Sequence, residues 1–121
     1  VPLPISVPCH SRLLGAAAEL FRADLEQIAF HPPRLPVIPN YDPRREHSPA
    51  ASRELLKMQM ISPVRWQETV EMLISKGVTT FVEIGPRRVL SGLVKNIDRR
   101  PRLLYAGDGE SLRKTVAALL T

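Results

Sequence analysis

The sequence contains a single cysteine, Cys9, which excludes both an internal disulfide and a cysteine-rich zinc site. This scarcity is typical of a reducing compartment, and we expect a cytoplasmic protein. No apolar run approaches the ~18 residues that a membrane-spanning helix needs. The first residues lack the initiator Met, the basic region and the apolar core of a signal peptide. The sequence therefore predicts no membrane segment, and its beginning is typical of a cut made inside a larger protein.

Aromatic residues are also few, at 5% of the chain, whereas the charge balance is strongly basic. Seventeen Lys and Arg against twelve Asp and Glu give a formal net charge of +5 and a pI of about 10.0. Such a balance favours acidic partners, among them nucleic acid, anionic membranes, phosphorylated ligands and acidic proteins. Nucleic-acid modules gather their cations on one face or interleave them with stacking aromatics, but here the cations are scattered. We expect neither nucleic acid nor a membrane as partner.

Twelve prolines, about twice the usual share, stand mostly between periodic segments and divide the chain into short elements. Composition predicts strands at 3–7, 35–38, 79–84 and 103–105. Helical periodicity predicts helices between positions 13 and 28, 49 and 58, 63 and 76, 89 and 97, and 109 and 120, with their periodic apolar residues turned inward. This alternation indicates an α/β fold with short parallel strands and flanking helices. The first two strands lack neighbours, so the chain looks like part of a sheet.

His10 is the first candidate for chemistry, because it directly follows an apolar segment and precedes a helix. Ligands of open α/β sheets gather beyond the carboxyl ends of the strands, and histidine is the commonest general base near neutral pH. The alternative, which the residues alone favour, is that His10 caps the following helix or packs against it. Cys9 is expected to be buried and inert, because adjacent residues that leave a strand point to opposite faces.

The other titratable residues predict no second site. His31 and His47 lie in proline-rich connections without metal-ligand spacing, and we expect both to face solvent. Glu68 and Glu71 share a helix face without a histidine, so no metal site is expected. Glu83 lies inside a predicted strand and is interpreted as structural, since a carboxylate there needs a partner.

Four blocks of sequence resemble, in the same order, the malonyl-CoA:acyl carrier protein transacylases. They are residues 7–14 (VPCHSRLL), 35–40 (LPVIPN), 59–66 (QMISPVRW) and 81–86 (FVEIGP). The resemblance implies part of an α/β-hydrolase-like acyltransferase core. Residues 1–6 would end the small ferredoxin-like subdomain, and residues 7–121 would form the C-terminal part of the large subdomain. The N-terminal half of the enzyme would be absent.

The resemblance also implies an activity and roles for two residues. The family transfers a malonyl group from malonyl-CoA to the phosphopantetheine thiol of acyl carrier protein in fatty acid biosynthesis, through an acyl-serine. His10 matches its general base, and Gln59 matches the residue whose backbone carbonyl orients that base. No cofactor is expected, since the coenzyme A thioester and phosphopantetheine are substrates. The expected partners are acyl carrier protein, malonyl-CoA and the missing N-terminal part of the enzyme.

Two departures from the family pattern matter. No G-H-S-x-G sequence occurs, so the nucleophile is missing and the chain alone is expected to be inactive. The family's Gly-Pro-Gly-Lys turn reads Gly85-Pro86-Arg87-Arg88, and Arg87 puts in doubt a backbone conformation with positive φ there.

Two alternatives stay open: an acyltransferase domain fragment from a multienzyme fatty acid or polyketide synthase, and a non-catalytic basic binding module.

Overall fold

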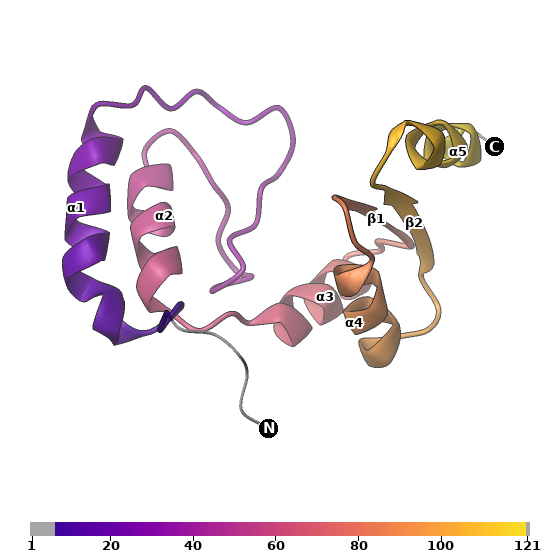
Figure 1. Ribbon diagram of the computed structural model, residues 1–121, viewed down its shortest axis with the longest axis horizontal. Helices are drawn as coiled ribbons and strands as arrows, with labels where there is room; N and C mark the ends of the chain where they lie inside the picture. The colour runs from indigo at the N-terminus through magenta and orange to yellow at the C-terminus, as the bar shows by residue number, and fades with distance from the viewer. Residues whose placement is uncertain (1–6, 121) are drawn as a thin grey trace. The chain divides into compact units, whose positions relative to one another are not determined.

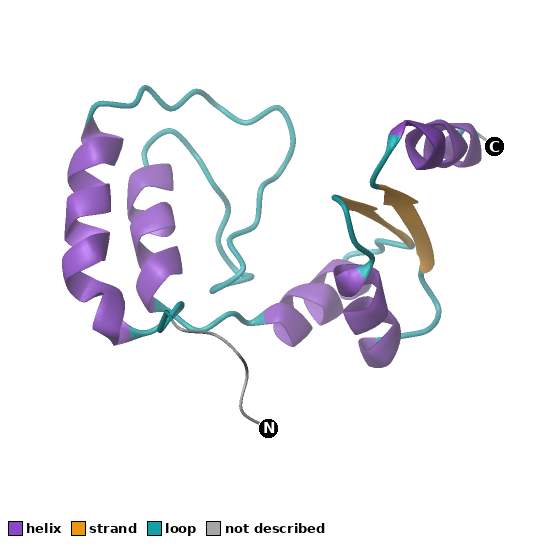
Figure 2. Cartoon of the chain, viewed as in Figure 1, coloured by secondary structure: helices purple, strands orange, loops and turns teal. Residues whose placement is uncertain are grey.

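The computed structural model describes residues 7–120, in two compact units that divide the chain after Thr69 (Figure 1). Each unit is described by itself. The predicted strand at 3–7 falls almost wholly on residues 1–6, outside the described residues, and so does the predicted end of a small subdomain. The described chain combines helices, two short strands and long loops (Figure 2), which confirms a mixed α/β fold.

The first unit is built on two helices that lie side by side, α1 (Gly15–Glu26) and α2 (Ser52–Ile61) (Figure 1). A short 3-10 helix, η1 (Arg12–Leu14), leads into α1 and contacts both. Ala18 and Leu25 of α1 and Leu55 of α2 are the buried apolar residues of this pair. A small residue such as Ala18 lets helix backbones approach closely, and full burial of a leucine contributes about 1.5–3 kcal/mol.

The connection between α1 and α2 contains no strand, so the predicted strand at 35–38 is wrong. Pro36 within it and Pro39 directly after it lack the N–H donors that a sheet ladder needs, and Leu35 is 76% exposed. The segment is held by single backbone hydrogen bonds instead. The His47 N–H donates to the Val37 carbonyl at 2.8 Å, and the Arg65 N–H donates to the Asn40 carbonyl at 2.7 Å.

The second unit contains a small parallel sheet. Its strands are β1 (Thr80–Ile84) and β2 (Arg102–Ala106), paired in parallel with Thr80 opposite Arg102 and Ile84 opposite Ala106. Helix α4 (Val89–Ile97) makes the crossover, and α5 (Gly109–Leu119) packs on β2. Helix α3 (Trp66–Ser75) precedes β1, and the unit begins within it. Both predicted strands of this unit, and their parallel pairing, are confirmed.

Helix ends follow the local sequence in this unit. Gly77, at φ +89°, lies in the left-handed region, and its N–H donates to the Ile74 carbonyl at 2.9 Å, which ends α3 as predicted. Asp108 caps α5 by accepting the Ser111 N–H at 2.7 Å. The predicted start of α3 at residue 63 is wrong, because the helix begins at Trp66.

The helix α2 also begins later than predicted, at Ser52 rather than at Pro49. The Ser48 hydroxyl accepts the Ala51 N–H at 3.1 Å and so closes a turn that precedes the helix. A serine–proline pair therefore marks the approach to this helix and not its first residue.

Many helix faces that the periodicity turns inward lie exposed in this structure. On α4, Val94 is buried, but Val89, Leu90 and Leu93 are exposed. On α5, the buried residue is Thr115, whose hydroxyl donates to the Tyr105 carbonyl at 2.6 Å. The predicted inward positions are thus only partly correct, because the described helices and strands bury only some of the apolar residues on each helix face.

Candidate active site

His10 lies in a tight turn just before η1, with φ +58°. It is the only non-glycine residue between 7 and 120 with a positive φ, so Arg87 does not adopt the conformation that the glycine of the family turn suggested. Histidine enters the left-handed region more readily than most side chains, but a strained backbone persists only where its surroundings hold it. The cap of η1 is Ser11, not His10.

The structure brings together the two predicted site residues, His10 and Gln59, from 49 positions apart. The His10 Nδ1 atom lies 2.8 Å from the Gln59 carbonyl oxygen. A carbonyl only accepts, so Nδ1 carries the proton, and the neutral imidazole presents Nε2 as its basic nitrogen. The Gln59 amide nitrogen lies 3.5 Å from the same Nδ1, but two donors cannot share a hydrogen bond. The partner of the imidazole is therefore the backbone.

Helix α2 fixes the position of that carbonyl. Gln59 lies one helical turn after the buried Leu55, so the packing of α2 on α1 sets where its backbone oxygen points. Helix carbonyls in the last turn lack partners within the helix. The Gln59 oxygen, two residues before the end of α2 at Ile61, is such a group, and the His10 imidazole satisfies it.

Two sequence predictions about the exposure of titratable side chains in the first unit are wrong. Cys9 is exposed, not buried, because the chain turns at residues 8–11 rather than continuing as a strand. His47 does not face solvent freely: it is half-buried, and its Nδ1 lies 3.2 Å from the Ser52 hydroxyl. That hydroxyl donates to the Ser48 carbonyl at 2.7 Å, so it accepts from His47 and belongs to the start of α2. His31 is exposed, as predicted.

Glu83 has the structural role that its place in a strand indicated. Its carboxylate accepts the Leu90 N–H at 2.9 Å and the Ser91 N–H at 2.7 Å, at the start of α4. Hydrogen bonding from Ser91, together with the other amides of that turn, holds the pKa of the Glu83 carboxyl below its usual range. The free amides of this helix start are therefore satisfied by the chain's own carboxylate.

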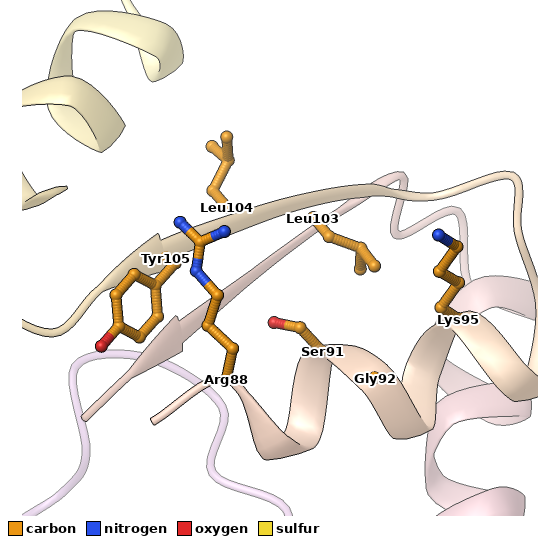
Figure 3. A pocket seen from close by; sticks show the side chains of 7 residues that line it. All are labelled: Arg88, Ser91, Gly92, Lys95, Leu103, Leu104 and Tyr105. Carbon is orange, nitrogen blue, oxygen red and sulfur yellow. The ribbon is translucent and has the colours of Figure 1, made fainter. Parts of the chain in front are cut away.

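A shallow hollow of about 250 Å³ lies between α4 and β2 (Figure 3). The Arg88 guanidinium stacks over the Tyr105 ring, 4.5 Å from its centroid. The hollow is smaller than the roughly 300–1,000 Å³ of ordinary ligand sites, and it contains neither predicted site residue. Its lining consists of Arg88, Ser91, Gly92, Lys95, Leu103, Leu104 and Tyr105.

Nothing in residues 7–120 indicates a metal centre or a membrane span. No three His, Cys, Asp or Glu side chains of that range gather closely enough to hold a metal ion. None of its helices combines the length and the apolar character that crossing a bilayer requires.

Comparison with known proteins shows which sequences the chain is similar to. No protein-family model matches it. It is 40% identical over 119 residues to the malonyl CoA-acyl carrier protein transacylase of Bacillus subtilis, covering 98% of this chain and 38% of that protein. The Salmonella typhimurium transacylase is 41% identical over 97 residues, which cover 80% of this chain and 31% of that protein.

Solved structures give the same result. A malonyl-transacylase in complex with a type II polyketide synthase acyl carrier protein matches with a TM-score of 0.91 and 41% identity, over 98% of this chain and 38% of that one. The transacylase of Coxiella burnetii matches with a TM-score of 0.91 and 34% identity, over the same shares. The chain spans little more than a third of the length of these relatives. Over 80–98% of its own length, it is similar to a segment of that size in the malonyl CoA-acyl carrier protein transacylases.

Proposed function

We propose that this chain supplies the histidine side of an acyl-transfer site. The reaction is transfer of a malonyl group from malonyl-CoA to the phosphopantetheine thiol of acyl carrier protein, in the cytoplasm and in fatty acid biosynthesis. The observation that carries the proposal is the 2.8 Å contact between the His10 Nδ1 and the Gln59 carbonyl, in a chain similar to transacylases over 98% of its length. The coenzyme A thioester and the phosphopantetheine thiol are substrates, and the proposal includes no cofactor.

In the first half-reaction, His10 acts on a serine that lies outside these 121 residues, since they contain no G-H-S-x-G sequence. Nε2 takes the proton of the serine hydroxyl as its oxygen attacks the malonyl thioester carbonyl. The carbon–sulfur bond breaks, and the imidazolium gives its proton to the coenzyme A thiolate. The products are malonyl-serine and free coenzyme A.

The second half-reaction reverses these roles with a new thiol. Nε2 takes the proton of the phosphopantetheine thiol, and the thiolate attacks the malonyl-serine ester. The carbon–oxygen bond breaks, and the proton returns to the serine oxygen. His10 therefore ends each cycle neutral, with Nδ1 still bonded to the carbonyl.

A neutral acceptor behind the imidazole suits this chemistry. Hydrogen bonds to an ionised group are roughly twice as strong as those between neutral groups, so the Gln59 carbonyl stabilises an imidazolium less than an aspartate would. The carbonyl therefore orients the imidazole without placing a negative charge beside it. We infer that this balance supports proton return to a leaving thiol over activation of water.

The charge of the chain fits the proposed partner. A net charge of +5 attracts the acidic acyl carrier protein and the phosphates of coenzyme A. One structural relative is bound to an acyl carrier protein of a type II polyketide synthase. That observation supports a second candidate, malonyl delivery to polyketide synthesis, whether by a discrete enzyme or by a domain of a multienzyme synthase.

The test is a chimera in which this chain replaces the matching 119 residues of the Bacillus subtilis relative. Incubation with malonyl-CoA should add one malonyl group to the intact mass. His10→Ala should lower malonyl transfer to acyl carrier protein by at least ~100-fold, the usual effect of a positioned general base. The matched control His31→Ala, at an exposed histidine, should leave transfer unchanged. Equal rates in the two variants would support the non-catalytic binding module instead.

A further inference from the structure

The hydroxyl of Ser11 makes contacts on both sides of the strained His10. It donates to the Pro8 carbonyl at 2.8 Å and accepts the Leu13 N–H at 3.3 Å. The Ser11 backbone carbonyl also accepts the Leu14 N–H at 3.1 Å. One side chain thus joins the segment before His10 to the first turn of η1 after it.

The bond to Pro8 closes a turn over residues 8–11. In an ordinary β-turn, the backbone N–H of the fourth residue donates to the carbonyl of the first. Here the Ser11 hydroxyl provides that donor, a known use of serine side chains in turns. His10 occupies the third position, where a type II turn requires positive φ, and its φ is +58°.

This turn also determines where the imidazole lies. Residues with a Cβ leave the left-handed region when nothing holds them there. If His10 relaxed toward negative φ, its side chain would leave the direction that now brings Nδ1 to 2.8 Å from the Gln59 carbonyl. The hydrogen bond at Gln59 and the turn closed by Ser11 therefore depend on each other.

We propose that Ser11 is a positioning residue for His10: its hydroxyl holds the turn that keeps Nδ1 on the Gln59 carbonyl and Nε2 free. The catalytic meaning of this role rests on the proposed function, but the geometric role does not. A serine that only capped η1 would stabilise that helix and leave the state of the imidazole unchanged.

The test is the tautomer of His10, measured by ring ¹⁵N NMR on the 121-residue chain, well above the pH range in which histidine titrates. The chain has three histidines, and a His10→Gln variant assigns the relevant signals. Ser11→Thr and Ser11→Val have nearly the same shape and differ in the hydroxyl. Ser11 has φ −137° and ψ 159°, an extended backbone that accepts both β-branched residues.

We expect the parent and Ser11→Thr to keep the Nδ1-protonated form. Ser11→Val should shift the tautomer ratio about fivefold toward Nε2 protonation, the effect of weakening the Nδ1–H bond to the Gln59 carbonyl by about 1 kcal/mol. Ser111→Ala is the matched control, because it removes a capping hydroxyl from α5 in the second unit. If Ser11→Val fails to fold, Ser11→Ala removes the oxygen without adding methyl groups.

Two outcomes would overturn the proposal. One is that Ser11→Val and Ser11→Thr give the same tautomer ratio, and the other is that Ser111→Ala shifts the ratio as much as Ser11→Val does. Neither measurement uses malonyl-CoA, so this proposal can fail while malonyl transfer by the chimera stands. Equally, the tautomer shift can be observed even if the chimera proves inactive.

Discussion

Replacing Leu55 with alanine tests whether the packing of α1 against α2 supports the candidate site. Leu55 is completely buried, and the substitution removes three carbons, about 2.4 kcal/mol of transfer free energy at ~0.8 kcal/mol each. The cavity left behind raises the expected loss to about 2.7–5.0 kcal/mol. A unit of this size has a total stability of only about 3–10 kcal/mol. We therefore expect the unit to lose a large fraction of its stability.

The measurement is urea unfolding of the chain followed by far-UV circular dichroism, with Leu20→Ala as the matched control. Leu20 lies on α1 and is 73% exposed, so the same substitution there should change the free energy of unfolding by no more than ~0.5 kcal/mol. Leu55 also precedes Gln59 by one turn of α2, so Leu55→Ala should weaken the Nδ1-protonated state of His10. Equal unfolding losses in both variants would refute this account of the packing.

Two further predictions concern the second unit. Gly107→Ala should destabilise the chain by about 1–3 kcal/mol, because the added Cβ would overlap the Tyr105 ring and hydroxyl and the backbone carbonyl of Gly85. Gly92 lies in α4, and a Cβ added there would meet nothing within 4 Å, so Gly92→Ala should instead stabilise the chain by about 0.5–1 kcal/mol. Thermal unfolding of the two variants distinguishes these effects. Hydrogen bonds from Arg100 lower the pKa of Asp98 from 3.8 to about 2. The folded state has the lower pKa, so this contribution to stability is present above about pH 4 and is lost as the pH falls toward about 2. Asp98→Asn should remove that part of the pH dependence in urea titrations, and an unchanged profile would contradict it.

The second unit could be predicted from the sequence more completely than the first, because its signals are local. β-branched and aromatic residues specify β1, a Gly specifies the end of α3, and Asp108 caps α5 through a neighbour three positions away. Glu83 could be interpreted as structural because a carboxylate in a strand needs donors. The amides that serve it belong to the next helix.

The first unit depends on contacts between distant positions, which no local pattern contains. The segment at 35–38 has the composition of a strand, but Pro36 has no N–H to pair, and backbone bonds from His47 and Arg65 hold the connection instead. Cys9 was expected to be buried because it and His10 were expected to leave the strand on opposite faces, whereas a turn exposes it. The partner of His10 was available only from the family resemblance, since a backbone carbonyl leaves no trace in residue type.

That last feature affects how such a site tolerates mutation. The group that orients His10 is an oxygen that every amino acid carries, delivered by the course of α2 rather than by the side chain at position 59. Gln59→Ala keeps this oxygen, whereas a substitution elsewhere that shifts the helix axis removes it from reach. The site should therefore tolerate substitution of Gln59, which forms the contact. It should be sensitive to substitution of buried residues that position α2 without touching the imidazole. The carbonyl that orients His10 is set by the path of the backbone. A search for sites by side-chain chemistry would therefore not find it.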